Sequence, residues 1–275
     1  MILRVAPPHT AETAWEDAFL MRSEHAMQPY FAPMAALMPK TLLVDFTHQL
    51  IDRDYMFQTF IEGERWDHVW DELTPDENNI LWDEFGTIMK QIHEVRGERF
   101  GLPLPEFQFE RWSQAVIDRL ERTLQAAKEL QLAITDLEQI LGIVRAHPGQ
   151  LDEVQIPRLL HGDLWAFNLL IARDENGPRI VGVLDADRAW WGDPMADWTM
   201  FILAHAEPEE GHTHFWRAYG LGEERPAARF RKTVYDGMHA ATALVYSVRN
   251  HDEGTVHRAN GTLREVVEAL PALVD

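Results

Sequence analysis

The chain has 275 residues, 46% of them hydrophobic, contains no cysteine and carries a formal net charge of −20 at pH 7. This length and apolar content suffice to bury the core of one large domain or of two lobes. The lack of cysteine excludes disulfides, thiolate metal sites and cysteine nucleophiles. The acidic charge argues against nucleic acid as a partner, because phosphates are bound by clustered Lys and Arg.

No segment has the features of a membrane span or a targeting peptide. No run approaches the about 20 apolar residues that a transmembrane helix needs, and two prolines interrupt the first apolar residues too soon for a signal peptide. We therefore expect a cytoplasmic protein without a membrane partner. The acidic surface is expected to be mainly solvated, and it would also attract small cationic substrates.

The amino-terminal quarter predicts short strands and one helix. Its apolar runs are short and end at Pro-Pro or Glu-Gly pairs, as strands do, whereas one intervening segment has helical periodicity. The expected elements are a strand at residues 2–5, a helix at 11–27 with a capping box at 13–16, and strands at 41–46 and 55–61.

From Thr74 onward the sequence predicts mainly helices, because apolar residues recur at helical spacing. Segments 207–211 and 250–261 are rich in glycine and charge and are expected to be exposed loops. Together with the amino-terminal strands, this pattern predicts an α+β protein. The expected helices cover residues 80–93, 107–146, 198–203, 230–248 and 263–270.

One motif carries the chemistry. His161-Gly162-Asp163 is followed by Asn168 and later by Asp185, which reproduces the spacing His-x-Asp-x-x-x-x-Asn and a subsequent Asp. In phosphoryl-transfer enzymes with this spacing, the first Asp accepts the proton of the substrate hydroxyl, and the Asn and the later Asp hold Mg²⁺. The complete spacing favours this chemistry over ordinary loop residues.

The segment between Asn168 and Asp185 predicts a β-hairpin, because two apolar runs flank an Asp-Glu-Asn-Gly turn. If Asn176-Gly177 form a two-residue turn, Asn168 lies opposite Asp185, and one metal ion could contact both. Pro178 lacks an N–H group and could shift this register by a residue.

These motifs, together with Gly192-Asp193-Pro194 and Asp197, resemble those of the aminoglycoside phosphotransferase family and its choline kinase and macrolide kinase relatives. The resemblance implies a protein-kinase-like two-lobe fold. Residues 1–63 would form a truncated amino-terminal sheet lobe, and residues 64–275 an α-rich carboxy-terminal lobe. It also implies Mg²⁺-dependent phosphorylation of a small-molecule hydroxyl by ATP, with GTP left open as the donor.

The resemblance also implies roles for individual residues of the catalytic centre. The loop interior, Trp165-Ala166-Phe167, departs from the more common His-Pro-Gly of the family, which leaves the chemistry unchanged but the substrate open. The implied residues are the base Asp163, the Mg²⁺ ligands Asn168, Asp185 and Asp187, and the supporting residues His161 and Asp197.

For the nucleotide, the resemblance implies a cation–carboxylate pair and a hinge. Arg4 would contact the α- and β-phosphates and pair with Glu16, although helix capping explains Glu16 equally well, and Glu12 and Glu24 are alternatives. The adenine would bond to the backbone of a segment that could also be a plain sheet edge. This hinge comprises Thr59, Phe60 and Ile61.

The acceptor site is less clear from the sequence. Each candidate has a plain structural alternative: core packing for the indoles and solvation for the acids. His93 is expected to be a core or capping residue, because no acid or base is spaced to partner it. A homodimer is expected only as the commonest oligomer. The acceptor candidates are Trp190, Trp191, Asp236, Asp252 and Glu253.

Three residues precede Arg4, so the sequence does not contain the glycine-rich turn that covers the nucleotide phosphates in this fold. A late gene start, a clipped chain, a partner chain that supplies the strands, or lost catalysis would each explain this. We therefore expect weak nucleotide binding, because misplaced phosphates cost orders of magnitude in rate. A kinase-like protein that binds ligands without catalysis is the main alternative.

A two-metal phosphoesterase is a second alternative, because Gly211-His212-Thr213-His214 and Asn250-His251 resemble parts of such a site. The order of these pieces is wrong for that class of enzyme, and Asp45-x-x-His48 has the wrong spacing. Short motifs of this kind often arise by chance.

Overall fold

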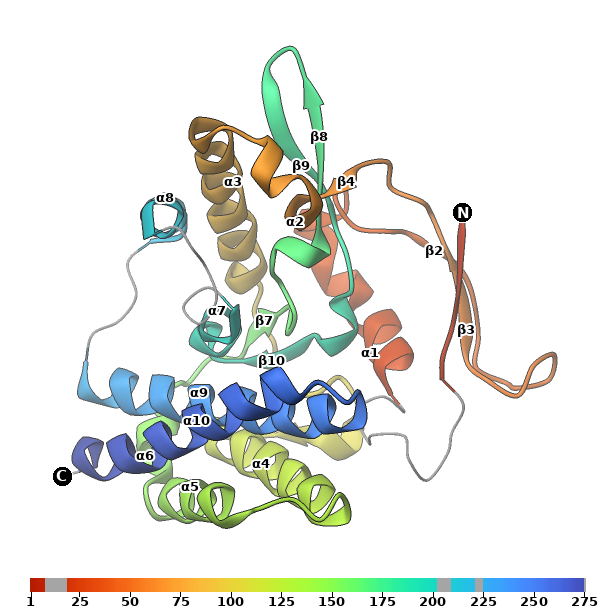
Figure 1. Ribbon diagram of the computed structural model, residues 1–275. Helices are drawn as coiled ribbons and strands as arrows, with labels where there is room; N and C mark the ends of the chain where they lie inside the picture. Colours follow the sequence, from red (N-terminus) through yellow and green to blue (C-terminus); the bar gives the residue numbers. More distant parts are fainter. Residues whose placement is uncertain (8–18, 202–208, 221–224, 275) are drawn as a thin grey trace.

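The computed structural model describes residues 1–7, 19–201, 209–220 and 225–274 (Figure 1). The expected α+β class is confirmed: three small antiparallel sheets are combined with long helices. Figure 1 shows the first sheet at one side of the molecule, whereas helices α4, α5, α9 and α10 gather at its lower end. In the described residues, no helix is long and apolar enough to cross a membrane.

The first sheet has the order β1 (Ile2–Val5), β3 (Tyr55–Gln58) and β2 (Thr41–Asp45). Strand β3 is shorter than expected, because Thr59 leaves the sheet and its N–H donates to the carbonyl of Lys40 (2.9 Å). Helix α1 (Leu20–Met27) and the 3-10 segment η1 (Gln28–Met34) follow β1. The capping box expected at residues 13–16 lies outside the described residues.

Two other sheets and the helices complete the chain. The second sheet has the order β4 (Glu64–Arg65), β8 (Leu169–Asp174) and β9 (Gly177–Val183), and the third has the order β6 (Gln108–Phe109), β5 (Phe100–Gly101), β10 (Trp190–Gly192) and β7 (Arg158–Leu160). The α-helices are α2 (Trp66–Val69), α3 (Pro75–Glu94), α4 (Trp112–Glu129), α5 (Thr135–Ala146), α6 (Pro148–Leu151), α7 (Pro194–Phe201), α8 (Glu209–Tyr219), α9 (Pro226–Arg249) and α10 (Glu253–Ala269). Short 3-10 segments are η2 (Trp70–Glu72), η3 (Pro105–Phe107), η4 (Ala166–Asn168), η5 (Ala186–Arg188) and η6 (Leu270–Leu273).

Helix α3 carries much of the core. Thr74 begins it with a capping box. The Thr74 hydroxyl accepts a hydrogen bond from the backbone N–H of Glu77, and the Glu77 carboxylate accepts one from the backbone N–H of Thr74. The buried face of α3 packs against α8. The two helices approach closely at Gly86, where an added Cβ would lie 2.5 Å from the carbonyl oxygen of Phe215. A larger residue would therefore push them apart.

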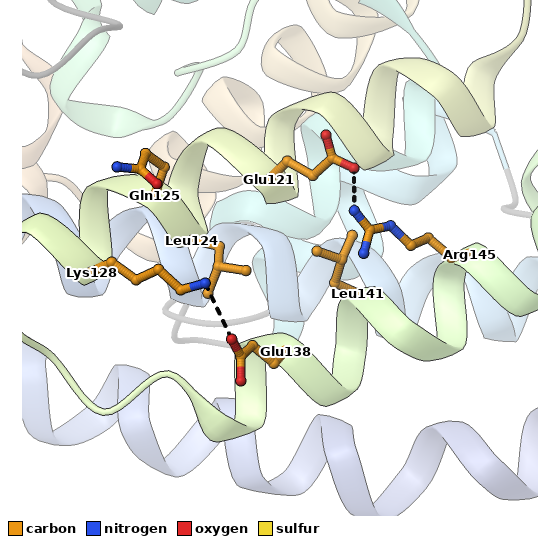
Figure 2. Close-up of a pocket in the computed structure, with 7 residues that line it drawn as sticks. All are labelled: Glu121, Leu124, Gln125, Lys128, Glu138, Leu141 and Arg145. Atoms are coloured by element: carbon orange, nitrogen blue, oxygen red, sulfur yellow. Dashed lines mark hydrogen bonds and ion pairs between the residues drawn. The ribbon is translucent and has the colours of Figure 1, made fainter.

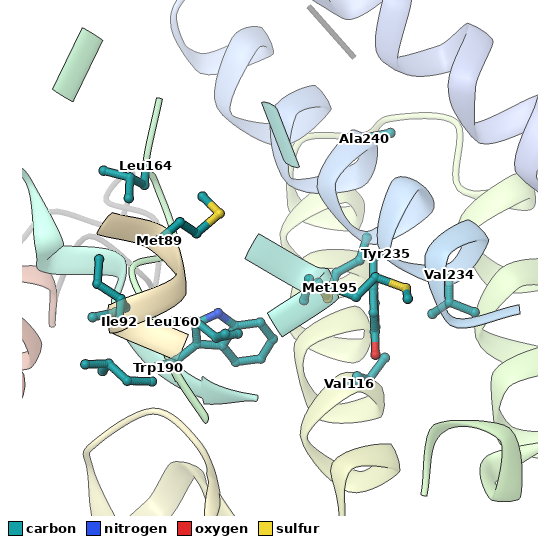
Figure 3. Packing of buried hydrophobic residues seen from close by; sticks show 14 of the residues in the cluster. Met89, Ile92, Val116, Leu160, Leu164, Trp190, Met195, Val234, Tyr235 and Ala240 are labelled. Atoms are coloured by element: carbon teal, nitrogen blue, oxygen red, sulfur yellow. The ribbon is translucent and has the colours of Figure 1, made fainter. Parts of the chain in front are cut away.

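One buried hydrophobic cluster spans most of the molecule, and Figure 3 shows part of it around Leu160, Trp190 and Met195. Met27 and Phe31, from α1 and η1, belong to the same cluster. The amino-terminal residues therefore share a core with the helical part of the chain.

A buried polar network crosses this core between β10 and α9. One carboxylate oxygen of Asp193 accepts hydrogen bonds from Arg231 Nε (3.0 Å) and from the Tyr235 hydroxyl (2.8 Å). The hydroxyl of Tyr235 in turn accepts a bond from the indole N–H of Trp112 (2.5 Å). Because each buried polar group has a partner, the network joins these elements instead of weakening the core.

Two segments expected to be loops contain helices. Helix α8 begins at Glu209, and α10 begins at Glu253, with the carboxylate of Asp252 accepting a bond from the N–H of Thr255 (3.0 Å) as its cap. Glycines 254 and 261 suggested a loop, but buried contacts on one face of α10 outweigh their low helix propensity. Residues 202–208 lie outside the described part of the chain.

Candidate functional site

The His-Gly-Asp motif lies just after strand β7 in a turn that only glycine fits. Gly162 has a φ of +80°, which is unfavourable for other residues. In addition, the carbonyl of Arg188 occupies the place that a side chain at this position would need. The turn places Asp163 at the end of the buried strand, where its carboxylate is only partly exposed.

Asp197, on helix α7, binds the backbone of this turn. Its two carboxylate oxygens accept hydrogen bonds from the N–H groups of His161 and Gly162, both at 2.7 Å. Burial acts to raise the pKa of Asp197, but its hydrogen bonds and the nearby histidines outweigh this effect, so that the pKa lies below its ordinary value. The carboxylate therefore stays charged inside the core.

His93 corrects an expectation from the sequence. It is buried, as expected, but it does have an acidic partner: Nε2 lies 3.1 Å from the Asp197 carboxylate, and Nδ1 lies 2.8 Å from the Tyr219 hydroxyl. The partner was not recognised because 104 residues separate His93 from Asp197 in the chain. His93 thus joins α3, α7 and α8 next to the catalytic motif.

Asp163 and Asn168 are in direct contact. The side-chain nitrogen of Asn168 donates to the backbone carbonyl of Asp163 (2.6 Å) and to its carboxylate (3.0 Å). The Asn168 side-chain oxygen is then the atom that could bind a metal ion. Burial raises the pKa of Asp163 to about 7, although the charge of Arg188 and the bond from Asn168 oppose this rise.

The predicted hairpin is present, but its register differs from the expected one. Asp174 pairs with Gly177, so Glu175-Asn176 form the turn, and an irregularity after Leu170 shifts the pairing once more. Asn168 consequently lies opposite Leu184, whose N–H donates to its carbonyl (2.9 Å). Gly177 accounts for the difference, because its φ of +104° is adopted at the first strand position instead of inside the turn.

Asp185 leaves the hairpin with a left-handed backbone (φ 60°) and meets Arg4 from the first sheet. One guanidinium nitrogen of Arg4 lies 3.1 Å from Asp185 and 3.4 Å from Asp187, and the other lies 2.5 Å from Glu24. Glu24, one of the alternatives expected from the sequence, is therefore a partner of Arg4 in the described residues; Glu16 lies outside them. Glu24 also accepts a bond from Gln58 (2.6 Å).

The oxygen donors at this point suit a hard divalent cation such as Mg²⁺. The Asp185 side chain is half exposed, whereas that of Asp187 is mostly buried. This burial raises the pKa of Asp187 to about 7, and the negative charge of Asp185 is the second cause. These two carboxylates, with the amide oxygen of Asn168, are the groups that could hold one cation. In the described structure, the guanidinium of Arg4 places positive charge beside Asp185 and Asp187.

Arg188 was not recognised from the sequence. Its positive charge opposes the rise of the pKa at both Asp163 and Asp187, and its backbone packs on Gly162. A basic residue directly after Leu-Asp-x-Asp was the available signal. The site thus has two arginines near its acidic groups, Arg4 and Arg188.

The expected hinge follows β3. Phe60 is 63% exposed, and the Ile61 side chain lies against Gly182 at the start of the hairpin. Thr59 is bonded to Lys40 through both its N–H and its hydroxyl. For Phe60 and Ile61, the described residues supply no hydrogen-bond partner to the backbone, so these groups could serve a ligand.

Four acceptor candidates have packing or capping roles in the structure. Trp190 and Trp191 are 4% and 5% exposed and belong to the core, where Trp190 packs on Trp112 (ring centroids 4.9 Å apart). Asp252 caps α10, which packs mainly on α9 and α5, and Glu253 follows it in the first turn of α10.

Asp236 keeps a place among the acceptor candidates. It lies on α9, where its carboxylate is 3.0 Å from the ammonium group of Lys232, and burial raises its pKa.

The His214 side chain, part of the suspected metal motif, is instead bonded to Asp83 (3.0 Å).

One described cavity lies away from these residues. It has a volume of about 410 Å³, lies between α4 and α5, and contains none of the predicted site residues. Figure 2 shows that two ion pairs cross it, Lys128–Glu138 and Arg145–Glu121. These pairs join neighbouring helices at a largely exposed surface.

The Phosphotransferase enzyme family profile matches residues 1–231, and the chain belongs to this family. The chain is 26% identical over 168 residues to the probable ketoamine kinase of Pasteurella multocida (strain Pm70), which is 55% of this chain and 53% of that protein. It is 26% identical over 219 residues to the probable ketoamine kinase of Klebsiella aerogenes, which is 70% of this chain and 68% of that protein. The first match thus spans about half the length of the relative.

The fold is that of protein-kinase-like phosphotransferases. The crystal structure of a thermostable mutant of aminoglycoside phosphotransferase APH(4)-Ia, in its apo form, has a TM-score of 0.68 and 18% identity, and covers 97% of this chain and 86% of that one. A ternary complex of the same enzyme with ADP and hygromycin B has a TM-score of 0.63 and 17% identity, and covers 91% and 82%. At this identity, the likeness establishes the fold.

Proposed function

We propose that this protein transfers the γ-phosphoryl group of ATP to a hydroxyl group of a small molecule. The observation that carries the proposal is the junction of Asp163, Asn168 and the Arg4–Asp185–Asp187 cluster. A base, an amide ligand and a pair of carboxylates meet there beside two arginines. Family membership supports the same reaction class.

In this mechanism, Asp163 accepts the proton of the acceptor hydroxyl while the hydroxyl oxygen attacks the γ-phosphorus. A new P–O bond forms, the bond from the γ-phosphorus to the bridging oxygen breaks, and ADP leaves with the electron pair. Asn168, Asp185 and Asp187 would hold Mg²⁺, which neutralises phosphate charge when bound. Arg4 would contact the phosphates from the first sheet, and Asp197 keeps the catalytic turn in place.

The first 63 residues would supply the nucleotide side of the site. The backbone of Phe60 and Ile61 is proposed to bond the adenine, and the division at residue 63 separates this part from residues 64–275. ADP in the related ternary complex supports a nucleotide donor. ATP is preferred to GTP only because of the family resemblance. The cytoplasmic location and the homodimer stay predictions.

We propose an acceptor that carries sugar-like hydroxyl groups and an amino group. The names of the curated relatives, ketoamine kinases, and the hygromycin B bound by the related enzyme support this class. The net charge of −20 favours the approach of a cationic molecule. Asp236 is the remaining acidic candidate for contact with such an acceptor.

Phosphoryl transfer to a panel of fructosamines, aminoglycosides and amino alcohols tests the proposal. We expect Mg²⁺-dependent ADP release with at least one acceptor, and about a 10³-fold lower rate in Asp163→Asn. Asp174→Asn, at the exposed end of strand β8, is the control and should keep the wild-type rate. Turnover that survives in Asp163→Asn would contradict the assignment of the base, and nucleotide binding without turnover would favour a non-catalytic protein.

A further inference from the structure

The interior of the catalytic loop carries an aromatic stack on its outer side. Between Asp163 and Asn168, the rings of Trp165 and Phe167 are stacked, with centroids 3.8 Å apart and planes inclined by 25°. Asn168 points inward and is buried, whereas Phe167, the preceding residue, points outward and is 41% exposed. Nothing in the proposed chemistry uses these two rings.

A third layer comes from a different part of the chain. The guanidinium carbon of Arg65, in β4, lies 4.8 Å from the centroid of the Phe167 ring. Arg65 is itself held by two hydrogen bonds to the Asp67 carboxylate, at 2.9 and 2.6 Å. A guanidinium fixed in this way can pack flat on a ring and keep it in place.

Phe167 therefore has one stacked partner, Trp165, and a second contact from Arg65. A ring that packs against two side chains is suited to restrain the loop, whereas a ring that binds a ligand by stacking needs one face free of such contacts. The loop needs such a restraint, because η4 is a single 3-10 turn closed by the bond from the N–H of Asn168 to the carbonyl of Trp165 (2.9 Å).

We propose that the Arg65–Phe167–Trp165 stack is a positioning device that keeps Asn168 in the orientation that binds the metal ion and contacts Asp163. This inference rests on the proposed function. Asp197 holds the loop at the His161-Gly162 end, and the stack holds it at the Asn168 end. The loop interior, Trp165-Ala166-Phe167, differs from the more common sequence of the family. Its aromatic side chains supply this restraint.

The test compares Phe167→Leu, which keeps an apolar side chain but loses the stack, with Phe167→Tyr, which keeps the stack. Mn²⁺ affinity in the presence of AMP-PNP is measured by electron paramagnetic resonance, together with kcat and the acceptor KM for Mg²⁺-dependent transfer from ATP to an acceptor identified with the panel above. We expect Phe167→Leu to weaken Mn²⁺ binding severalfold and to slow transfer about tenfold. Phe167→Tyr should stay within about twofold of the wild type in both measurements.

Phe46→Leu is the matched control, because the Arg22 guanidinium lies over the ring of Phe46, just after β2, at a similar distance, 5.1 Å. It should lower thermal stability about as much as Phe167→Leu but leave Mn²⁺ binding unchanged. Equal Mn²⁺ affinity in Phe167→Leu and Phe167→Tyr would overturn the proposal. An acceptor KM that rises at constant kcat would also overturn it and would make the stack a substrate platform.

Failure of the proposed function would look different. Asn168→Ala would then bind Mn²⁺ as tightly as the wild type, because Asn168 would not be a metal ligand. In that case the stack would have no metal site to position, and the result would exclude both proposals. A loss of Mn²⁺ affinity in Asn168→Ala together with an unaffected Phe167→Leu would exclude the stack proposal alone.

Discussion

The two ends of the catalytic centre are built in different ways. At one end, Asp197 is fully enclosed and bonded to two backbone N–H groups and to His93. At the other end, Arg4 contacts Glu24, Asp185 and Asp187, and the Asp185 side chain is half exposed. The first arrangement is a hydrogen-bonded network in the core, and the second is a partly buried ion-pair cluster that reaches solvent at Asp185.

This difference separates a fixed part of the site from an exchangeable part. Buried hydrogen bonds to backbone groups are costly to break, because the groups left behind remain unsatisfied. Solvent-accessible ion pairs contribute little to stability and can be replaced by other charges. We therefore infer that Asp163 is held in place by the Asp197 side, whereas the Arg4 side can release its carboxylates to a metal ion and its guanidinium to phosphates.

The strongest test of this comparison is Asp197→Ala. The substitution leaves two buried N–H groups and His93 without their acceptor, and we expect the free energy of unfolding to fall by about 3–5 kcal/mol. Urea unfolding of the purified protein measures this change. Asp83→Ala, which removes a half-exposed carboxylate beside His214 and Arg217, is the control and should lose about 1 kcal/mol or less. Similar losses in both variants would contradict the comparison.

The pH dependence of the unfolding free energy gives a second test of the buried region around α7, which carries Asp197. His239 donates from Nε2 to the carbonyl of Ala196 on α7 (2.7 Å), and burial, followed by the charge of Arg119, lowers its pKa to about 4. Between pH 6.5 and 4 the unfolded chain binds a proton here that the folded chain does not. The contribution of His239 to stability is therefore complete above pH 6.5 and decreases by about 3 kcal/mol as the pH falls to 4.

Comparison of the wild type with His239→Gln isolates this contribution, because the other titrating groups are present in both proteins. His161, whose pKa burial also lowers to about 4, acts in the same direction, whereas Asp163 and Asp187 act in the opposite one. We expect the stability of the variant to decrease less on acidification. Parallel curves of unfolding free energy against pH would show that His239 does not titrate in this way.

Arg4→Met tests the exchangeable side. The side chain keeps its apolar stem but loses its charge, so we expect the affinity for Mg²⁺·AMP-PNP to fall about tenfold at low salt, with a smaller loss of unfolding free energy than in Asp197→Ala. Isothermal titration calorimetry and urea unfolding give the two values. A variant that loses stability but binds the nucleotide normally would show that Arg4 is structural.

The smallest expected effect comes from Tyr219→Phe, which removes the hydroxyl that contacts His93 but keeps the ring. We expect a loss of about 1 kcal/mol in unfolding free energy, and an unchanged affinity for nucleotide. Tyr246→Phe, at an exposed position on α9, should change neither quantity. A larger loss would mean that the network around Asp197 extends through His93 to helix α8.

Local patterns predicted much of this molecule. Strand β1, the capped helix α3 and the hairpin after Asn168 follow from periodicity and turn residues, and the family followed from the spacing of His161, Asp163 and Asn168. These features depend on residues that are close in the sequence. The side chains that determine these features interact with residues only a few positions away, so the sequence pattern predicts them.

What the sequence did not predict depends on contacts over long distances or on small differences between turns. His93 meets Asp197 only because α3 and α7 pack beside β7. Glu24 meets Arg4 because α1 packs beside η5, where Asp187 also lies. The hairpin register differs because Gly177 takes its left-handed conformation after the turn and not within it.

The polar network around Asp193 sets a limit on how this protein can be shortened. The family match ends at residue 231, which is the arginine that pairs with Asp193, but the second partner of that carboxylate is Tyr235, four residues further along α9. A fragment cut at the family boundary would remove Tyr235 and leave Trp112 and Asp193 with buried groups that lack a partner. Any minimal version of the enzyme must therefore retain α9.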